Sequence, residues 1–94
     1  MLDRLTSMQV FVRVVGQGSF AAAASSLNLS QTMVTKHVSA LENHLGIALF
    51  HRSTRRLSLT EPGRLYLDRC QILLSNLEDM EQEVSAEALE PRGL

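Results

Sequence analysis

The sequence has no tryptophan, one cysteine and two prolines, and only 4% of its 94 residues are aromatic. A single cysteine excludes an internal disulfide, and the cytoplasm is the expected compartment. No apolar run reaches the roughly 20 residues of a membrane helix, and the first residues, MLDRLTSM, lack the apolar stretch of a signal peptide. Because aromatic side chains are scarce while hydrophobic content is 45%, we expect an aliphatic, mainly helical core.

Residue sets typical of catalytic or metal sites are also missing. His37 and His44 are two helical turns apart, about 10.5 Å, which is too far to share a metal. His51 has no cysteine or acidic cluster beside it in the sequence. No Ser-His-Asp arrangement, phosphate-binding glycine loop or carboxylate pair is recognisable. The sequence therefore predicts no enzyme, no metal site and no cofactor.

Charge is divided unevenly along the chain, although the formal net charge is only −1. Residues 1–60 carry six basic and two acidic side chains, whereas residues 61–94 carry three basic and eight acidic ones. Such asymmetry favours a polyanionic partner for the basic part. Ordinary solvation of a charged surface is the alternative explanation.

Apolar periodicity predicts helices over about 3–15, 20–26 and 31–44. Ser19 and Ser30 are suited to cap the second and third of them. A short helix, a tight turn and a second helix form a helix-turn-helix, whose second helix enters the DNA major groove. Amide, hydroxyl and ammonium groups on that helix suit base edges and phosphates, although a solvated surface would explain each residue singly. The candidate contacts on it are Gln31, Thr32, Thr35, Lys36 and Ser39.

The segments IALFHR (47–52) and LSLT (57–60) predict a small two-stranded hairpin. Its tip carries Arg52, Arg55 and Arg56 with no acid between them, so these arginines repel one another unless an anion is present. Such a tip can follow a DNA backbone or enter a narrow minor groove. A solvated turn is the alternative.

A long helix is predicted over about 61–88, capped by Thr60. Apolar residues recur in it at alternating steps of four and three, which is the seam of a coiled coil. Because the helix is about 40 Å long, nothing else in so short a chain can cover this seam, and we expect dimerisation. The seam residues are Tyr66, Cys70, Leu73, Leu77, Met80 and Val84.

Together these segments resemble the N-terminal winged helix-turn-helix domain of LysR-type transcriptional regulators. The resemblance rests on the motifs GSF, AAA, SQ, LE, LG, LF, Arg52 and LT, which stand at family spacing between residues 18 and 60. It implies a mainly α fold with three helices and a two-stranded wing over residues 1–60. A dimerisation helix over 61–89 and the start of a hinge over 90–94 would follow.

The resemblance also implies a bacterial dimer that reads an interrupted dyad-symmetric site in double-stranded DNA. It adds Ser30 and Met33 to the recognition contacts, and assigns Arg55 to the minor groove with Arg52 on phosphate. Family members continue into a domain that senses a small co-inducer. We expect no co-inducer site in these 94 residues.

Two departures from the family pattern fall in the recognition helix. Thr32-Met33-Val34-Thr35 stands where Pro-Ala-Val-Ser is frequent, and Lys36 replaces a frequent arginine. Lysine cannot make the two-pronged contact of a guanidinium, so we expect an unusual base preference. The alternative function is a helical interaction module whose seam binds a different protein.

Overall fold

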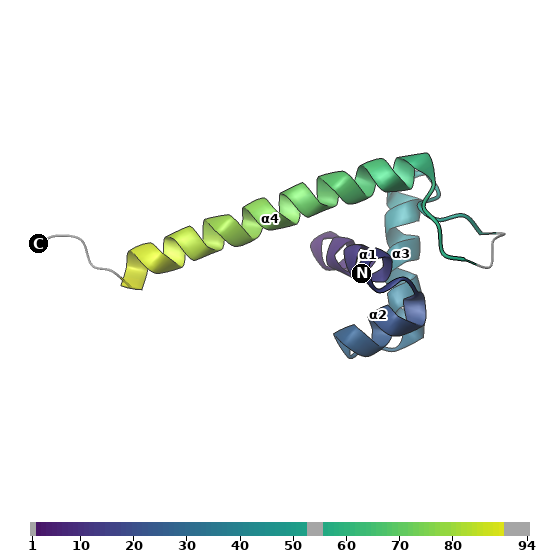
Figure 1. The fold of residues 1–94 in the computed structure, drawn as a ribbon, viewed down its shortest axis with the longest axis horizontal. Coiled ribbons are helices and arrows are strands. Elements are labelled where there is room, and N and C mark those ends of the chain that lie inside the picture. Colours follow the sequence, from purple (N-terminus) through teal and green to yellow (C-terminus); the bar gives the residue numbers. More distant parts are fainter. Residues whose placement is uncertain (1, 53–55, 90–94) are drawn as a thin grey trace, which may run out of the picture.

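The computed structural model describes residues 2–52 and 56–89, and over them the chain contains four helices (Figure 1). The first three helices pack against one another. The fourth begins on these three, where it crosses the first helix, and then extends beyond them. The molecule is 62 Å long and 27 Å wide. Each predicted helix is confirmed, with ends that differ by two residues at most. Their bounds are α1 Arg4–Gln17, α2 Phe20–Leu27, α3 Gln31–Leu45 and α4 Glu61–Leu89.

Side chains begin these helices at the predicted places. The hydroxyl oxygens of Ser19, Ser30 and Thr60 each accept a hydrogen bond from the backbone N–H three residues later, at 3.0–3.1 Å. Asp3 caps α1 in the same way, and hydrogen bonds from the side chain and backbone of Thr6 lower the pKa of Asp3. Each cap satisfies an N–H that has no partner inside its helix.

The first three helices each end at a residue in the left-handed conformation, namely Gly18, Asn28 and Gly46. Asn28, with φ of 59°, is the one non-glycine residue among them. The N–H of Leu29 then bonds to the carbonyl of Ala24 at 2.9 Å, which closes the end of α2. Only residues 28–30 separate α2 from α3, so the two form the predicted helix-turn-helix.

The core is built mainly from aliphatic side chains, which surround a small cluster of aromatic rings. Phe11 is fully buried, and its ring lies 5.5 Å from that of Phe50 and 5.6 Å from that of Tyr66. Ala23 in α2 is also fully buried, and its small side chain allows neighbouring helices to approach α2 closely. This packing holds α3 against both α1 and α2.

The predicted wing is represented by a single antiparallel bridge, Phe50 to Leu59, and among the described residues no strand is formed. The strand pairing does not extend from this bridge toward the helices, because the Leu49 N–H and the Thr60 carbonyl, which would bond to each other, have other partners. The Leu49 N–H donates to the Glu42 carboxylate at 2.7 Å, and the Thr60 carbonyl accepts from Arg64 in α4 at 2.9 Å. The tip of the hairpin falls on residues 53–55, which lie outside the described residues.

The start of α4 packs on the chain's own core, which changes the prediction for two seam residues. Cys70 is 1% exposed and Tyr66 is half-buried beside Phe11. Burial raises the pKa of the Cys70 thiol and raises the pKa of Tyr66 to about 12, so both stay protonated at neutral pH. These two residues were predicted to face a second copy, but α1 covers them.

The later part of α4 has no such cover. Leu73, Met80 and Val84 are 50%, 55% and 64% exposed, and Leu77 is partly exposed. The four belong to the predicted seam, so this part of it remains available to another molecule.

Among the described residues no single helix has the length and apolar character to cross a membrane. The two helices α1 and α2, which are bent by 120° relative to each other, reach that length and apolar character only when they are taken together.

Candidate nucleic-acid interface

The two sides of α3 differ sharply in burial. Its buried residues are spaced as one face of an amphipathic helix. This face packs against α1 and α2. The buried residues are Val34, His37, Val38, Leu41 and Glu42. The exposed residues on the N-terminal half, with its cap, are Ser30, Gln31, Thr32, Thr35 and Lys36.

Seven candidate DNA contacts lie on or beside this helix. The five exposed ones come first in the helix, while Met33 and Ser39 are half-buried at the edge of the same surface. Within residues 2–52 and 56–89 the structure gives no hydrogen bond or ion pair to the side chains of Gln31, Thr32, Thr35 or Lys36. Ser30 differs, because its oxygen caps α3. The hydroxyls of Thr32 and Thr35 therefore face solvent from a well-packed helix.

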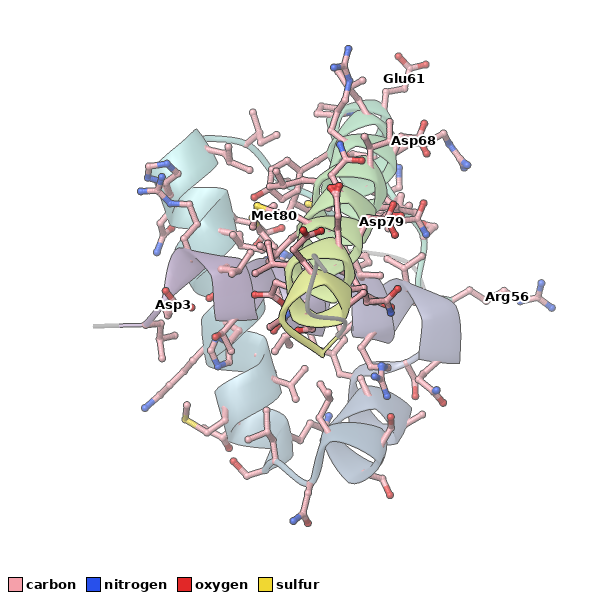
Figure 2. All side chains as sticks on the ribbon, turned by 90° about the vertical axis from the view of Figure 1, so that its left-hand side faces the viewer. Asp3, Arg56, Glu61, Asp68, Asp79 and Met80 are labelled. Atoms are coloured by element: carbon pink, nitrogen blue, oxygen red, sulfur yellow. The ribbon has the colours of Figure 1, made fainter. Side chains whose placement is uncertain are left out.

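The arginines near the wing fall into three situations. Arg52 pairs with Glu42, and its side chain stays 62% exposed. Arg56 is exposed and extends away from the helices (Figure 2). Arg55 lies outside the described residues. A shallow groove lined by Gln31, Arg56 and His51 joins the start of α3 to the base of the wing, so these elements form one continuous surface.

A buried polar contact fixes α3 on α1, and no sequence pattern predicts it. His37 is 5% exposed, and its Nδ1 lies 2.8 Å from the hydroxyl oxygen of Ser7, which is 1% exposed. His44, two turns further along α3, is exposed instead. Its Nδ1 lies 3.4 Å from a guanidinium nitrogen of Arg4. Among the described residues no three metal-binding side chains come together.

Ser7→Ala is expected to lower the free energy of unfolding by about 1–3 kcal/mol, because it leaves a buried ring nitrogen without its partner. Urea unfolding measures the change. Ser25→Ala is the matched control, since Ser25 is exposed on α2 and alanine suits a helix. Equal stability of the two variants would contradict a role for the Ser7–His37 hydrogen bond.

Comparison with known sequences gives one family for most of the chain. Residues 5–64 match the family described as bacterial regulatory helix-turn-helix protein, lysR family. An HTH-type transcriptional repressor of Pseudomonas aeruginosa (strain UCBPP-PA14) is 45% identical over 92 residues. The match covers 98% of this chain but 29% of the repressor, so the chain spans less than a third of this relative.

Comparison with solved structures gives the same fold bound to DNA. A complex of the BenM DBD with catB site 1 DNA has a TM-score of 0.89 at 31% identity, covering 94% of this chain and 98% of that chain. A CbnR DBD–DNA complex has a TM-score of 0.82 at 32% identity, covering 89% and 97%. The similarity thus includes α4 as well as the matched residues 5–64.

Proposed function

Because the chain belongs to the lysR family of bacterial regulatory helix-turn-helix proteins, we propose that it binds double-stranded DNA sequence-specifically, as the dimeric DNA-binding part of a cytoplasmic transcriptional regulator. The observation that carries this proposal is the exposed polar face of α3 on a helix whose other face is buried. Binding through this face requires no ordering of the backbone, because α3 is already fixed when its side chains meet base edges.

In this proposal α3 enters the major groove, which is wide enough for one helix. Gln31 suits the two-pronged pattern of adenine, the threonines suit thymine methyls and acceptors, and Lys36 suits phosphate or guanine. The proposed contacts on α3 are Ser30, Gln31, Thr32, Met33, Thr35, Lys36 and Ser39.

The segment between α3 and α4 acts as the wing, and we infer a two-stranded hairpin whose tip lies along the duplex. The single bridge from Phe50 to Leu59 supports this topology. Arg52 contacts backbone phosphate, while Arg55 and Arg56 reach toward the minor groove. Narrow minor grooves concentrate negative potential, which attracts guanidinium groups.

Two copies pair through the exposed part of the seam, from Leu73 to Val84. Pairing removes apolar surface from water along a helix that its own chain leaves uncovered. A symmetric dimer places two recognition helices about 34 Å apart, or a multiple of that distance, which matches dyad-symmetric half-sites.

Lys36→Ala is expected to weaken DNA binding about three- to tenfold and to flatten its salt dependence, because one phosphate-directed charge per protomer is lost. The probe is a duplex selected by the wild-type chain from a random-sequence pool. Binding at several salt concentrations gives the slope of log affinity against log salt.

Lys36→Arg is the matched control, since it keeps the charge and should keep the slope. The side chain of Lys36 is exposed, so neither change should affect folding. Wild-type binding that is absent, or that does not depend on salt, would contradict the proposed function.

A further inference from the structure

Glu42 is a buried carboxylate that the proposed DNA contacts do not include, although it joins the recognition helix to the wing. It lies near the end of α3 and is 9% exposed. One carboxylate oxygen accepts from the Leu49 N–H at 2.7 Å, and the other pairs with the Arg52 guanidinium. Both oxygens are therefore used, and both bonds reach the segment that leads into the wing.

The two partners of this ion pair differ in exposure. The side chain of Glu42 is 9% exposed, whereas that of Arg52 is 62% exposed. A guanidinium carries several N–H donors in a fixed plane, and the ion pair with Glu42 is made through Nη2 of Arg52. The remaining N–H donors of Arg52 can therefore bind a second acceptor, such as a phosphate oxygen, while Nη2 stays bound to the Glu42 carboxylate. Glu42 itself has both oxygens engaged and is too buried to meet DNA.

Holding an arginine in place has a specific consequence for binding. A long side chain loses rotamer freedom when it is fixed on a ligand. An arginine that is already fixed relative to α3 loses less rotamer freedom on binding. This advantage requires a DNA site in which a phosphate lies where the guanidinium points at the same time as α3 contacts its preferred bases. On other sequences the fixed arginine gives no such advantage.

We propose that Glu42 is a positioning residue, which orients the Arg52 guanidinium so that its phosphate contact coincides with base contacts made by α3. This inference rests on the proposed DNA-binding function. The carboxylate also repels phosphate, and it does so on every DNA sequence alike. Glu42 therefore acts on discrimination between sequences more than on general affinity.

The test is a double-mutant cycle with Glu42→Gln and Arg52→Ala. Glutamine keeps an oxygen for the Leu49 N–H but removes the charge that pairs with Arg52. Dissociation constants are measured for wild type, both single variants and the double variant, on the selected duplex and on a scrambled duplex of equal composition. Glu81→Gln is the control, because it removes the same charge from an exposed position on α4.

We expect Glu42→Gln to lower the ratio of selected to scrambled affinity about tenfold, within the range for residues coupled in one ion pair. Arg52→Ala should lower it to a similar extent, and the double variant should lower it no further. Glu81→Gln should leave it unchanged.

Two results would overturn the inference while leaving the proposed function intact. One is an unchanged ratio for Glu42→Gln. The other is an equal further loss when Glu42→Gln is added to Arg52→Ala, which would mean that the carboxylate acts on folding and not through the arginine. Failure of the wild-type chain to prefer the selected duplex would instead contradict the proposed function, and the inference with it.

Discussion

Gly63→Ala is expected to lower the free energy of unfolding by about 2–3 kcal/mol, as other overpacked sites do. Gly63 is buried in the first turn of α4, and a Cβ added there would lie 2.1 Å from the carbonyl oxygen of Leu49 and 3.0 Å from its carbon. No atoms approach so closely without displacement. The Leu49 carbonyl cannot move freely, because it accepts a hydrogen bond from the Thr60 N–H at 3.0 Å.

To accommodate the added methyl group, the start of α4 must move away from the segment that follows α3. Thermal unfolding followed by helical circular dichroism should show the midpoint lowered by on the order of 10–20 °C for a domain of this size. Because Leu49 also donates to Glu42, the displacement would reach the base of the wing as well.

Gly16→Ala is the matched control for this substitution. Gly16 lies inside α1 and is exposed, and a Cβ added there meets nothing within 4 Å. Alanine in a helix is favoured over glycine by roughly 0.5–1 kcal/mol, so this variant should unfold at the same temperature or slightly higher. A Gly63→Ala variant as stable as Gly16→Ala would show that α4 does not pack on Leu49 as described.

Local signals explain why the helices could be predicted from sequence. The caps at Ser19, Ser30 and Thr60 act over three residues, and the buried face of α3 repeats every three or four, so both are visible in one short segment. The polar contacts that orient α3 are different. Ser7 bonds to His37 across 30 positions, and no periodic pattern connects residues so far apart.

The seam shows a second limit of sequence patterns. A heptad repeat indicates that one helix face is buried but not which surface covers it. In α4 the repeat continues without interruption from Tyr66 to Val84, yet its first two members face the chain's own core while Met80 and Val84 are exposed. Likewise, the alternation in the wing segment could not reveal that Glu42 takes the Leu49 N–H from the strand pairing.

Met80→Lys is expected to convert the proposed dimer to monomers and to weaken binding to a duplex with two half-sites about 100-fold. Met80 is 55% exposed on the part of α4 that extends beyond the other helices, so lysine there leaves the packing of the monomer intact (Figures 1 and 2). In the dimer, two ammonium groups would lie in an apolar seam, where burial of unpaired charge is costly. Loss of pairing also removes the high effective concentration of the second recognition helix.

Sedimentation velocity and binding to duplexes with one or two half-sites measure the two effects separately. Ser75→Lys is the matched control, because Ser75 is exposed on the opposite side of the same helix and gains the same charge. It should remain a dimer and bind as wild type does. Met80→Lys should bind a single half-site as tightly as the wild-type chain, since α3 is unchanged. If Met80→Lys stays dimeric, two copies do not pair through the exposed seam of α4. If the wild-type chain is itself monomeric, the alternative in which α4 pairs with a different protein is favoured.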